Sequence, residues 1–189
     1  MWNIEEIKKD VRNGLSDYRY NHSIRVMEEA ESLARHYQAD IEKCMLCALT
    51  HDMCKEFTEK ENNEFIKKYN LPKELLNDEN KNIVHGFIAS ILVKEKYNFK
   101  EDMVLAVRYH TTGYPNMDLL AKIVYLADKI EKGKNYPGIE EERLLAYQDI
   151  DKAIILCLSN QIKHLKEKNK VINKIGYDTL KFLKENTTD

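Results

Sequence analysis

The sequence predicts an all-α protein, because apolar residues recur every three or four positions along almost all of the chain and no segment alternates as a half-buried strand does. Helix-capping residues and turn-rich breaks divide this pattern into separate helices. A chain of 189 residues fits one ordinary domain with a core large enough to hold a preformed site. We therefore expect a single domain over residues 1–189.

The first three helices are predicted from their inward faces and one cap. The first helix places four apolar side chains on one face, namely Ile4, Ile7, Val11 and Leu15. A long amphipathic helix from Asp17 to Tyr37 carries His22 on its inward face. Asp40 can cap a third helix, which places the pair His51 and Asp52 near its C-terminal end.

The later helical segments follow between clear breaks. Thr58 and Glu61 form a capping box for a fourth helix, and the step from Leu71 to Pro72 interrupts it. The remaining segments run from Gly86 to Tyr97, Asp102 to Tyr109, Leu119 to Ile130, Glu140 to Lys168 and Tyr177 to Glu185. No internal repeat or linker separates them, in keeping with one domain.

The composition indicates a globular protein and limits its partners. Hydrophobic residues make up 43% of the chain and charged residues 33%, which is too apolar for a disordered chain. The formal charge of -2 gives no overall positive field to attract long nucleic acids. A small anionic ligand therefore needs local cations, and we expect no long nucleic acid as a partner.

The sequence gives no sign of export or membrane insertion. The N-terminus lacks a signal peptide, and no stretch approaches the length of a membrane span, so we expect a cytoplasmic protein with no membrane partner. The four cysteines are too few and too unevenly spaced for a secreted disulfide framework. Cys44 and Cys47 share one apolar helix face, and we assign them to the core.

Six ionisable side chains fall on inward faces or at helix ends: His22, His51, Asp52, His85, His110 and Asp128. Burying such groups without partners is costly, and a metal ion would provide a common partner. Imidazole and carboxylate together suit iron, manganese or a similar divalent ion better than a structural zinc ion. Since His51 and Asp52 point about 100° apart on a helix, they can share an ion only where the helix end or the packing turns them together.

Each of these residues alone has an ordinary structural interpretation. A single buried histidine is more often bonded to a carbonyl group than to a metal, and Asp128 alone could pair with Lys129 or Arg108. Only the whole set indicates a metal centre. The remaining histidines, His36 and His164, lie among charged residues, and we assign them to solvated faces.

Several linked motifs carry a family resemblance. They are Arg19-Tyr20-Asn21-His22-Ser23-Ile24-Arg25-Val26, Leu49-Thr50-His51-Asp52 with Lys55, His85-Gly86, His110-Thr111-Thr112-Gly113, Lys122-Ile123-Val124-Tyr125-Leu126-Ala127-Asp128-Lys129-Ile130-Glu131, Tyr136-Pro137-Gly138 and Arg143. In this order they resemble the HD superfamily of metal phosphohydrolases, whose core is a helical bundle, and within it the YqeK family. The resemblance covers roughly residues 16–148.

The resemblance implies an HD-like bundle that splits symmetrical dinucleoside tetraphosphates, converting diadenosine tetraphosphate to two molecules of ADP. It also implies that His22, His51, Asp52 and Asp128 bind one divalent ion, expected to be iron, with manganese, cobalt or magnesium as alternatives. The residues that remain open are His85 and His110, which bind either a second ion or the phosphates. We favour phosphate contact.

A bridging phosphate is a poor electrophile, so the site must gather positive charge and supply a metal-activated water. The predicted catalytic residues are Asp52, which can orient the water, together with Lys55, His85 and His110. The predicted substrate contacts are Arg19, His22, Asp52, Lys55, His85, His110, Asp128, Lys134, Gly176 and Tyr177. In the family an arginine usually stands at Lys134, and the alternative for Gly176 and Tyr177 is a plain interhelical turn.

Three other functions are weighed against this one. Gly113-Tyr114-Pro115 partly resembles the HD-GYP phosphodiesterases of cyclic dinucleotides, but Tyr109-His110-Thr111 lacks their His-His-Glu run. Guanosine polyphosphate hydrolases resemble a pattern with Glu-Asp after the His-Asp pair, where this chain has Lys55-Glu56. A non-catalytic nucleotide-binding bundle is the third alternative, and a homodimer is left open.

Overall fold

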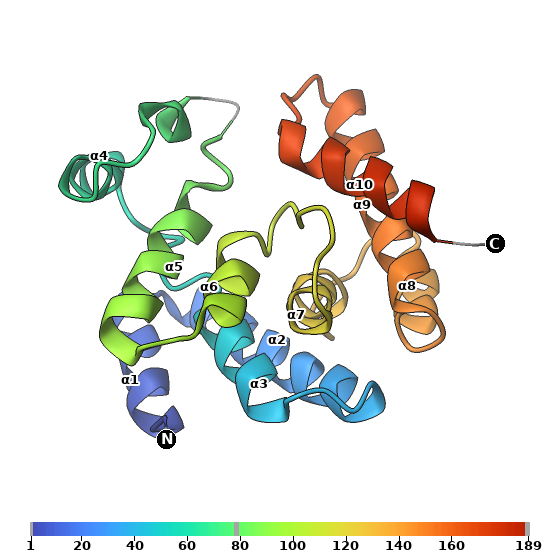
Figure 1. Ribbon diagram of the computed structural model, residues 1–189, viewed down its shortest axis with the longest axis horizontal. Helices are drawn as coiled ribbons and strands as arrows, with labels where there is room; N and C mark the ends of the chain where they lie inside the picture. The colour runs from blue at the N-terminus through green and yellow to red at the C-terminus, as the bar shows by residue number, and fades with distance from the viewer. Residues whose placement is uncertain (1, 78–79, 188–189) are drawn as a thin grey trace.

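The computed structural model describes residues 2–77 and 80–187, and all regular structure within these ranges is helical (Figure 1). The elements are α1 (Ile4–Gly14), α2 (Asp17–His36), α3 (Ile41–Thr50), α4 (Glu59–Lys68), the 3-10 helix η1 (Lys73–Leu76), α5 (Val84–Tyr97), α6 (Glu101–Arg108), α7 (Leu119–Ile130), α8 (Ile139–Ala146), α9 (Ile150–Glu167) and α10 (Lys174–Asn186). The predicted all-α class is confirmed, and α7 has the predicted bounds.

Side-chain caps set several helix boundaries. Asp40 accepts a backbone hydrogen bond at the start of α3, and Thr58 and Glu61 form both arms of the predicted capping box at α4. The predicted segment from Glu140 to Lys168 is divided into α8 and α9, because Asp149 has an extended backbone and its side chain caps α9. The apolar spacing continues across this cap, so periodicity alone did not indicate the boundary.

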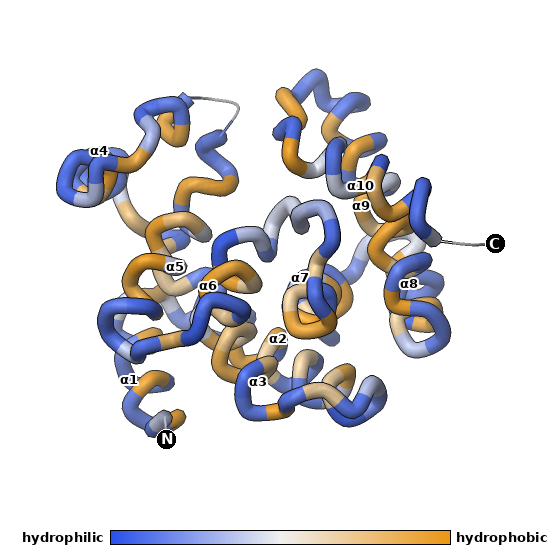
Figure 2. The backbone as a smooth tube through the Cα atoms, viewed as in Figure 1, coloured by the Kyte–Doolittle hydropathy of each residue, from blue (hydrophilic) through white to orange (hydrophobic). Residues whose placement is uncertain are grey.

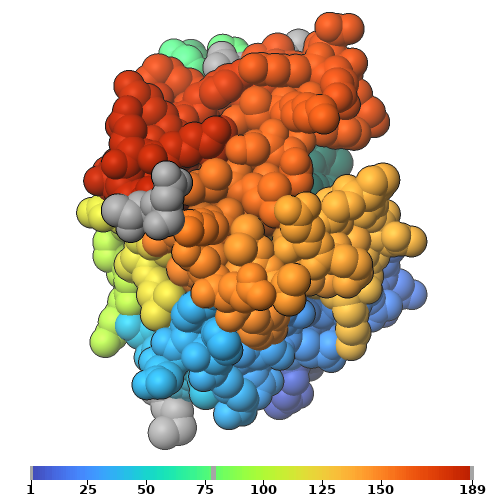
Figure 3. Space-filling model, turned by 90° about the vertical axis from the view of Figure 1, so that its right-hand side faces the viewer, coloured from blue at the N-terminus to red at the C-terminus, as the bar shows by residue number. Residues whose placement is uncertain are grey.

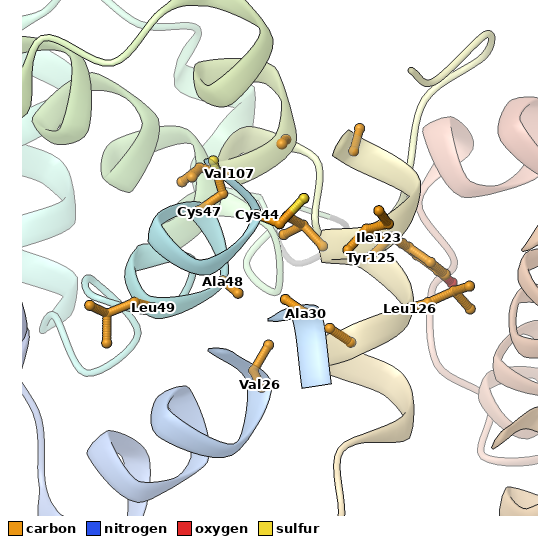
Figure 4. Packing of buried hydrophobic residues seen from close by; sticks show 14 of the residues in the cluster. Val26, Ala30, Cys44, Cys47, Ala48, Leu49, Val107, Ile123, Tyr125 and Leu126 are labelled. Carbon is orange, nitrogen blue, oxygen red and sulfur yellow. The ribbon is translucent and has the colours of Figure 1, made fainter. Parts of the chain in front are cut away.

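Helix α7 lies at the centre of the bundle and packs against α2, α3, α6 and α9 (Figure 1). Its side chains Ile123, Tyr125 and Leu126 are fully buried. In Figure 4, Val26 and Ala30 of α2 lie on one side of α7, whereas Tyr125 and Leu126 point to its other side. Close packing on several sides fixes the orientation of α7 and of the polar residues it carries inward.

The predicted core cysteines belong to this packing. Cys44 and Cys47 are both buried on α3, and burial raises the pKa of the Cys44 thiol to about 12. A thiol with so high a pKa is a poor nucleophile and a poor metal ligand at neutral pH. Both side chains therefore act as small apolar groups, as predicted.

The outer helices differ from this core. Along α4 the chain is mostly hydrophilic, with Ile66 as the buried residue of that helix (Figure 2). Helices α8, α9 and α10 pack on one another, and α8 and α9 also contact α7, on the side of the molecule away from α1 and α4 (Figure 1). Among the described residues, no helix combines the length and apolarity needed to cross a membrane.

Candidate metal centre and active site

The six side chains predicted for the site meet at one place inside the bundle. They come from α2, the end of α3, α5, the turn after α6, and α7, and they are His22, His51, Asp52, His85, His110 and Asp128. The first five are buried, and the side chain of Asp128 is 13% exposed. Helices far apart in sequence thus contribute donors to a common centre.

Two imidazoles and two carboxylates form the first half of the centre. The Nε2 atom of His22 lies 3.2 Å from Oδ1 of Asp128 and 3.9 Å from Oδ2 of Asp52. The Nε2 atom of His51 lies 3.6 Å from the same oxygen of Asp52 and 3.8 Å from the same oxygen of Asp128. The donor atoms of His22, His51 and Asp52 lie close enough together to hold a divalent ion, and Oδ1 of Asp128 adjoins both imidazoles.

The other oxygen of Asp52 forms the second half of the centre. Its Oδ1 atom lies 3.0 Å from Nε2 of His85 and 3.5 Å from Nε2 of His110, and the two Nε2 atoms are 3.0 Å apart. A Cβ atom at Gly86 would lie 2.7 Å from the carbonyl oxygen of Arg108. The missing side chain therefore lets α5 approach the end of α6, which brings these two imidazoles together.

Helix ends orient two of the imidazoles. The Nδ1 atom of His51 lies 2.6 Å from the carbonyl oxygen of Ala48, and that of His110 lies 2.7 Å from the carbonyl oxygen of Val107. Because a carbonyl oxygen only accepts, each Nδ1 carries the hydrogen and each Nε2 presents a lone pair to the centre. His51 is the C-cap residue of α3, which explains how both it and Asp52 face inward.

The third imidazole is oriented by Glu131, which sequence reasoning did not assign to the site. Its Oε1 atom lies 3.2 Å from Nδ1 of His22, while its Oε2 atom accepts from Nε of Arg25 at 2.6 Å and from the backbone N–H of Gly133. Glu131 is 2% exposed. A carboxylate behind a ligating histidine fixes its tautomer and raises its basicity. The available signal was the acidic residue three positions after Asp128.

The buried Nε2 atom of His51 tests whether these residues fit a metal ion. It has no hydrogen-bond partner among the residues that the structure describes, although the ring is fully buried. A buried acceptor left unpaired costs about 1–3 kcal/mol. A divalent ion at the centre would take up this lone pair together with the carboxylates. The donor set of imidazole and carboxylate fits such an ion.

The environment sets the protonation that metal binding requires. Burial lowers the pKa of His51 to about 4 and that of His85 to about 3. Burial alone would raise the pKa of Asp128, yet Lys129 and His22 hold it well below its ordinary value. Neutral imidazoles and ionised carboxylates therefore coexist at neutral pH, and both are competent ligands without loss of a proton.

Two cations flank each carboxylate of the centre. Nη1 of Arg19 lies 3.3 Å from a carboxylate oxygen of Asp52, and Nζ of Lys55 lies 3.7 Å from the other one. At Asp128, Nζ of Lys129 lies 2.8 Å from one carboxylate oxygen and Nζ of Lys134 lies 3.9 Å from the other. Burial lowers the pKa of Lys55. Of the two partners weighed for Asp128, Lys129 pairs with it, whereas Arg108 donates to Ser90. The centre thus lies within local positive charge, as an anionic ligand needs.

A cavity of about 220 Å³ adjoins the second half of the centre. Lys55 and Thr111 line it, and they also contact His85 and His110. Gly176, at the start of α10, also lines this cavity, and its contact with a nucleotide stays a prediction. Thr111 was missed as a site residue although it follows His110 directly.

Other predicted positions lie farther from the centre. The ring of Tyr177 is 38% exposed and lies 5.7 Å from the ammonium group of Lys166, and it does not line this cavity. Its contact with substrate stays a prediction. His36 and His164 are exposed, as expected for solvated faces.

An all-helical bundle that gathers histidines and aspartates around one point, beside a cationic cavity, defines a metal-binding protein suited to anionic ligands. The chain belongs to the HD domain family, whose family model matches residues 19–133. This confirms the family resemblance seen in the sequence.

The chain is also similar to curated proteins over most of its length. The symmetrical bis(5'-nucleosyl)-tetraphosphatase of Bacillus subtilis is 36% identical and aligns over 90% of this chain and 91% of its own. The protein of the same name from Halalkalibacterium halodurans is 39% identical over 86% and 87%. A solved structure of a predicted HD superfamily hydrolase involved in NAD metabolism, from Clostridium acetobutylicum, is 33% identical, with a TM-score of 0.92 over 99% of this chain and 100% of that one.

Proposed function

We propose that this protein is a metal-dependent hydrolase that splits symmetrical dinucleoside tetraphosphates, such as diadenosine tetraphosphate, into two nucleoside diphosphates. The observation that carries the proposal is the meeting of four imidazole Nε2 atoms and two carboxylates within a ring of four cations. Curated relatives that align over most of the chain have this activity in their names.

Metal binding is assigned to His22, His51, Asp52 and Asp128, with iron as the expected ion. A divalent ion held there supplies Lewis-acid activation of water and of phosphate oxygens. The second group, around His85 and Oδ1 of Asp52, meets the geometric requirement for another ion as well. We assign it to the phosphates, because the cavity lined by Lys55 opens on that side.

The side chains of the second half have distinct parts in the reaction. With a pKa of about 3, His85 is neutral in the metal-free site, so it stabilises phosphate by hydrogen bonding and not by charge. Lys55 and Arg19 supply the positive charge that the departing diphosphate needs. The second oxygen of Asp52 can orient the attacking water.

The overall reaction adds one water to the substrate. The water oxygen bonds to one of the two central phosphorus atoms, the bond from that phosphorus to the bridging oxygen breaks, and the two fully ionised diphosphates release two protons. In-line attack requires the water and the leaving oxygen on opposite sides of that phosphorus. Nucleotide substrates of this kind fit the cytoplasmic location expected from the sequence.

The proposal is tested by incubating the purified protein with iron(II) or manganese(II) and diadenosine tetraphosphate, and separating the products by chromatography. We expect two equivalents of ADP for each substrate molecule. Asp52→Ala should abolish turnover. Asp178→Asn, which alters a carboxylate paired with Lys174 on the surface, should leave turnover unchanged.

Other products would point to other functions. Formation of AMP and ATP would contradict symmetrical cleavage. Turnover of a cyclic dinucleotide or a guanosine polyphosphate, with diadenosine tetraphosphate left intact, would replace the proposed substrate. Tight nucleotide binding without turnover would favour the non-catalytic class. Elemental analysis of the active protein distinguishes one bound ion from two and identifies the ion.

A further inference from the structure

A second and larger cavity, of about 660 Å³, lies between α9 and the segment that follows α7. Its walls include Lys129 and Tyr136 from α7 and the following segment, Glu142 from α8, and Asn160 and Gln161 from α9. Figure 3 shows this side of the molecule, where the orange surface of α9 borders the gold surface of the segment after α7. None of the functions assigned so far uses this cavity.

The position of the second cavity links it to the metal centre. Lys129 lines the cavity, and its Nζ atom lies 2.8 Å from Oδ2 of Asp128. The first cavity reaches the opposite half of the centre through Lys55, which contacts His85. Gln161 lines both cavities. Each cavity is therefore linked to one half of the metal centre through a lysine, and the two cavities share Gln161 of α9 as a lining residue.

A symmetrical dinucleoside tetraphosphate has two identical ends, whereas this chain offers one centre with different surroundings on its two sides. The two ends must therefore occupy chemically different places. We propose that the larger cavity binds the second nucleoside of the substrate, while the smaller cavity binds the first and the tetraphosphate crosses the centre between them. This inference rests on the proposed function and extends it to the binding of the whole substrate.

The lining of the larger cavity suits a nucleoside. Its volume falls within the range of small-molecule sites, and the ring of Tyr136 offers a face for a base. The hydroxyl of Tyr136 and the amide of Asn160 both donate to Glu142, which fixes the wall.

The charges around the centre agree with a substrate that extends in both directions. Lys55 lines the smaller cavity and pairs with Asp52, whereas Lys129 lines the larger cavity and pairs with Asp128. Each half of a tetraphosphate thus meets a cation on its own side. Cleavage between these two cations divides the substrate at its centre, which yields two identical products.

The test compares diadenosine tetraphosphate with adenosine 5'-tetraphosphate, which lacks the second nucleoside. Two variants change the larger cavity: Tyr136→Ala removes the ring, and His164→Trp fills space from an exposed position on the lining. We expect each to lower kcat/KM for diadenosine tetraphosphate about tenfold, the order of effect of one lost base-stacking contact. Hydrolysis of adenosine 5'-tetraphosphate should change less than about twofold. The matched control is His36→Trp on α2, away from both cavities.

Calorimetry gives a measurement that does not depend on turnover. Wild-type protein loaded with manganese(II) should bind two ADP molecules per chain, and each cavity variant should bind one. Because Tyr136 bonds to Glu142 and its loss could disturb folding, His164→Trp provides an independent test. Equal losses on both substrates, or two bound ADP molecules in both variants, would overturn the inference. If wild-type protein does not split diadenosine tetraphosphate, the proposed function fails, and the titration alone decides whether the larger cavity binds a nucleotide.

Discussion

The helices that hold the metal centre and the helices that line the larger cavity differ in how firmly their side chains are fixed. His51 is fully buried and bonded to the carbonyl oxygen of Ala48, and Glu131 holds His22 from behind. Along the larger cavity, Tyr136 is 37% exposed and His164 is exposed. The reactive groups thus lie in a closely packed environment, while part of the surface assigned to the nucleoside is open to solvent.

The largest effect is expected when a buried side chain that is predicted to bind the metal is removed. We expect His51→Ala to reduce kcat/KM more than about 100-fold. Loss of a side chain that binds the metal should lower activity more than loss of a side chain that only orients such a ligand. Bound metal, measured by elemental analysis, should fall in parallel. His36→Ala, at an exposed histidine on α2, should keep full activity. Full activity in His51→Ala would show that His51 is not a metal ligand.

The pH dependence of metal-free protein tests the burial of the same imidazole. The pKa of His51 is about 4 in the folded state against 6.5 when solvated, so the unfolded state binds more protons between these values. The free energy of unfolding should therefore decrease as pH falls from 6.5 to 4, by roughly 3 kcal/mol from this residue. Urea unfolding at pH 7 and pH 4 measures this decrease. His51→Gln should flatten the decline, while His36→Gln should not.

A smaller effect is expected at Glu131, which orients a ligand without touching the proposed ion position. We expect Glu131→Gln to weaken metal binding about tenfold, since the amide keeps the shape of the carboxylate but not its charge behind His22. Competition with a chelator measures the affinity directly. Glu140→Gln, at an exposed glutamate paired with Arg143, is the matched control. If Glu131→Gln left the metal affinity unchanged, the role of Glu131 would be its ion pair with Arg25 and not the orientation of His22.

The smallest effect is expected at the partly exposed rim of the centre. Lys134 has 34% side-chain exposure and lies 3.9 Å from Asp128, so Lys134→Ala should lower kcat/KM no more than about fivefold. Lys134→Arg should retain or raise activity, because the guanidinium keeps the charge and can bind phosphate through two hydrogen bonds. If Lys134→Ala lowered kcat/KM as much as His51→Ala, the contrast between the buried ligands and the partly exposed lysine would be wrong.

Much of the fold followed from local rules in the sequence. The capping box of Thr58 and Glu61 and the bounds of α7 were predicted because caps and apolar periodicity act within a few residues. The break at Asp149 was not predicted, because the apolar spacing continues across it and a single cap competes with that pattern. The one-domain prediction for residues 1–189 and the possible homodimer remain predictions.

The candidate site was predicted less completely. The ligand types and their order were readable in the sequence, and His36 and His164 are exposed as predicted, although His164 also lines the larger cavity. Glu131 was missed because its contact with His22 spans 109 positions and nothing near it in the sequence indicates that partner. The cavities were missed for the same reason.

The helical class, the helix caps and the residue types able to bind a metal ion can be read from the amino-acid order, because they depend on neighbours within one or two turns. The packing of the helices is what makes the two oxygens of Asp52 face different pairs of histidines and makes Gln161 line both cavities. Such positions depend on how whole helices pack, and packing is set by many weak contacts between residues far apart in the chain.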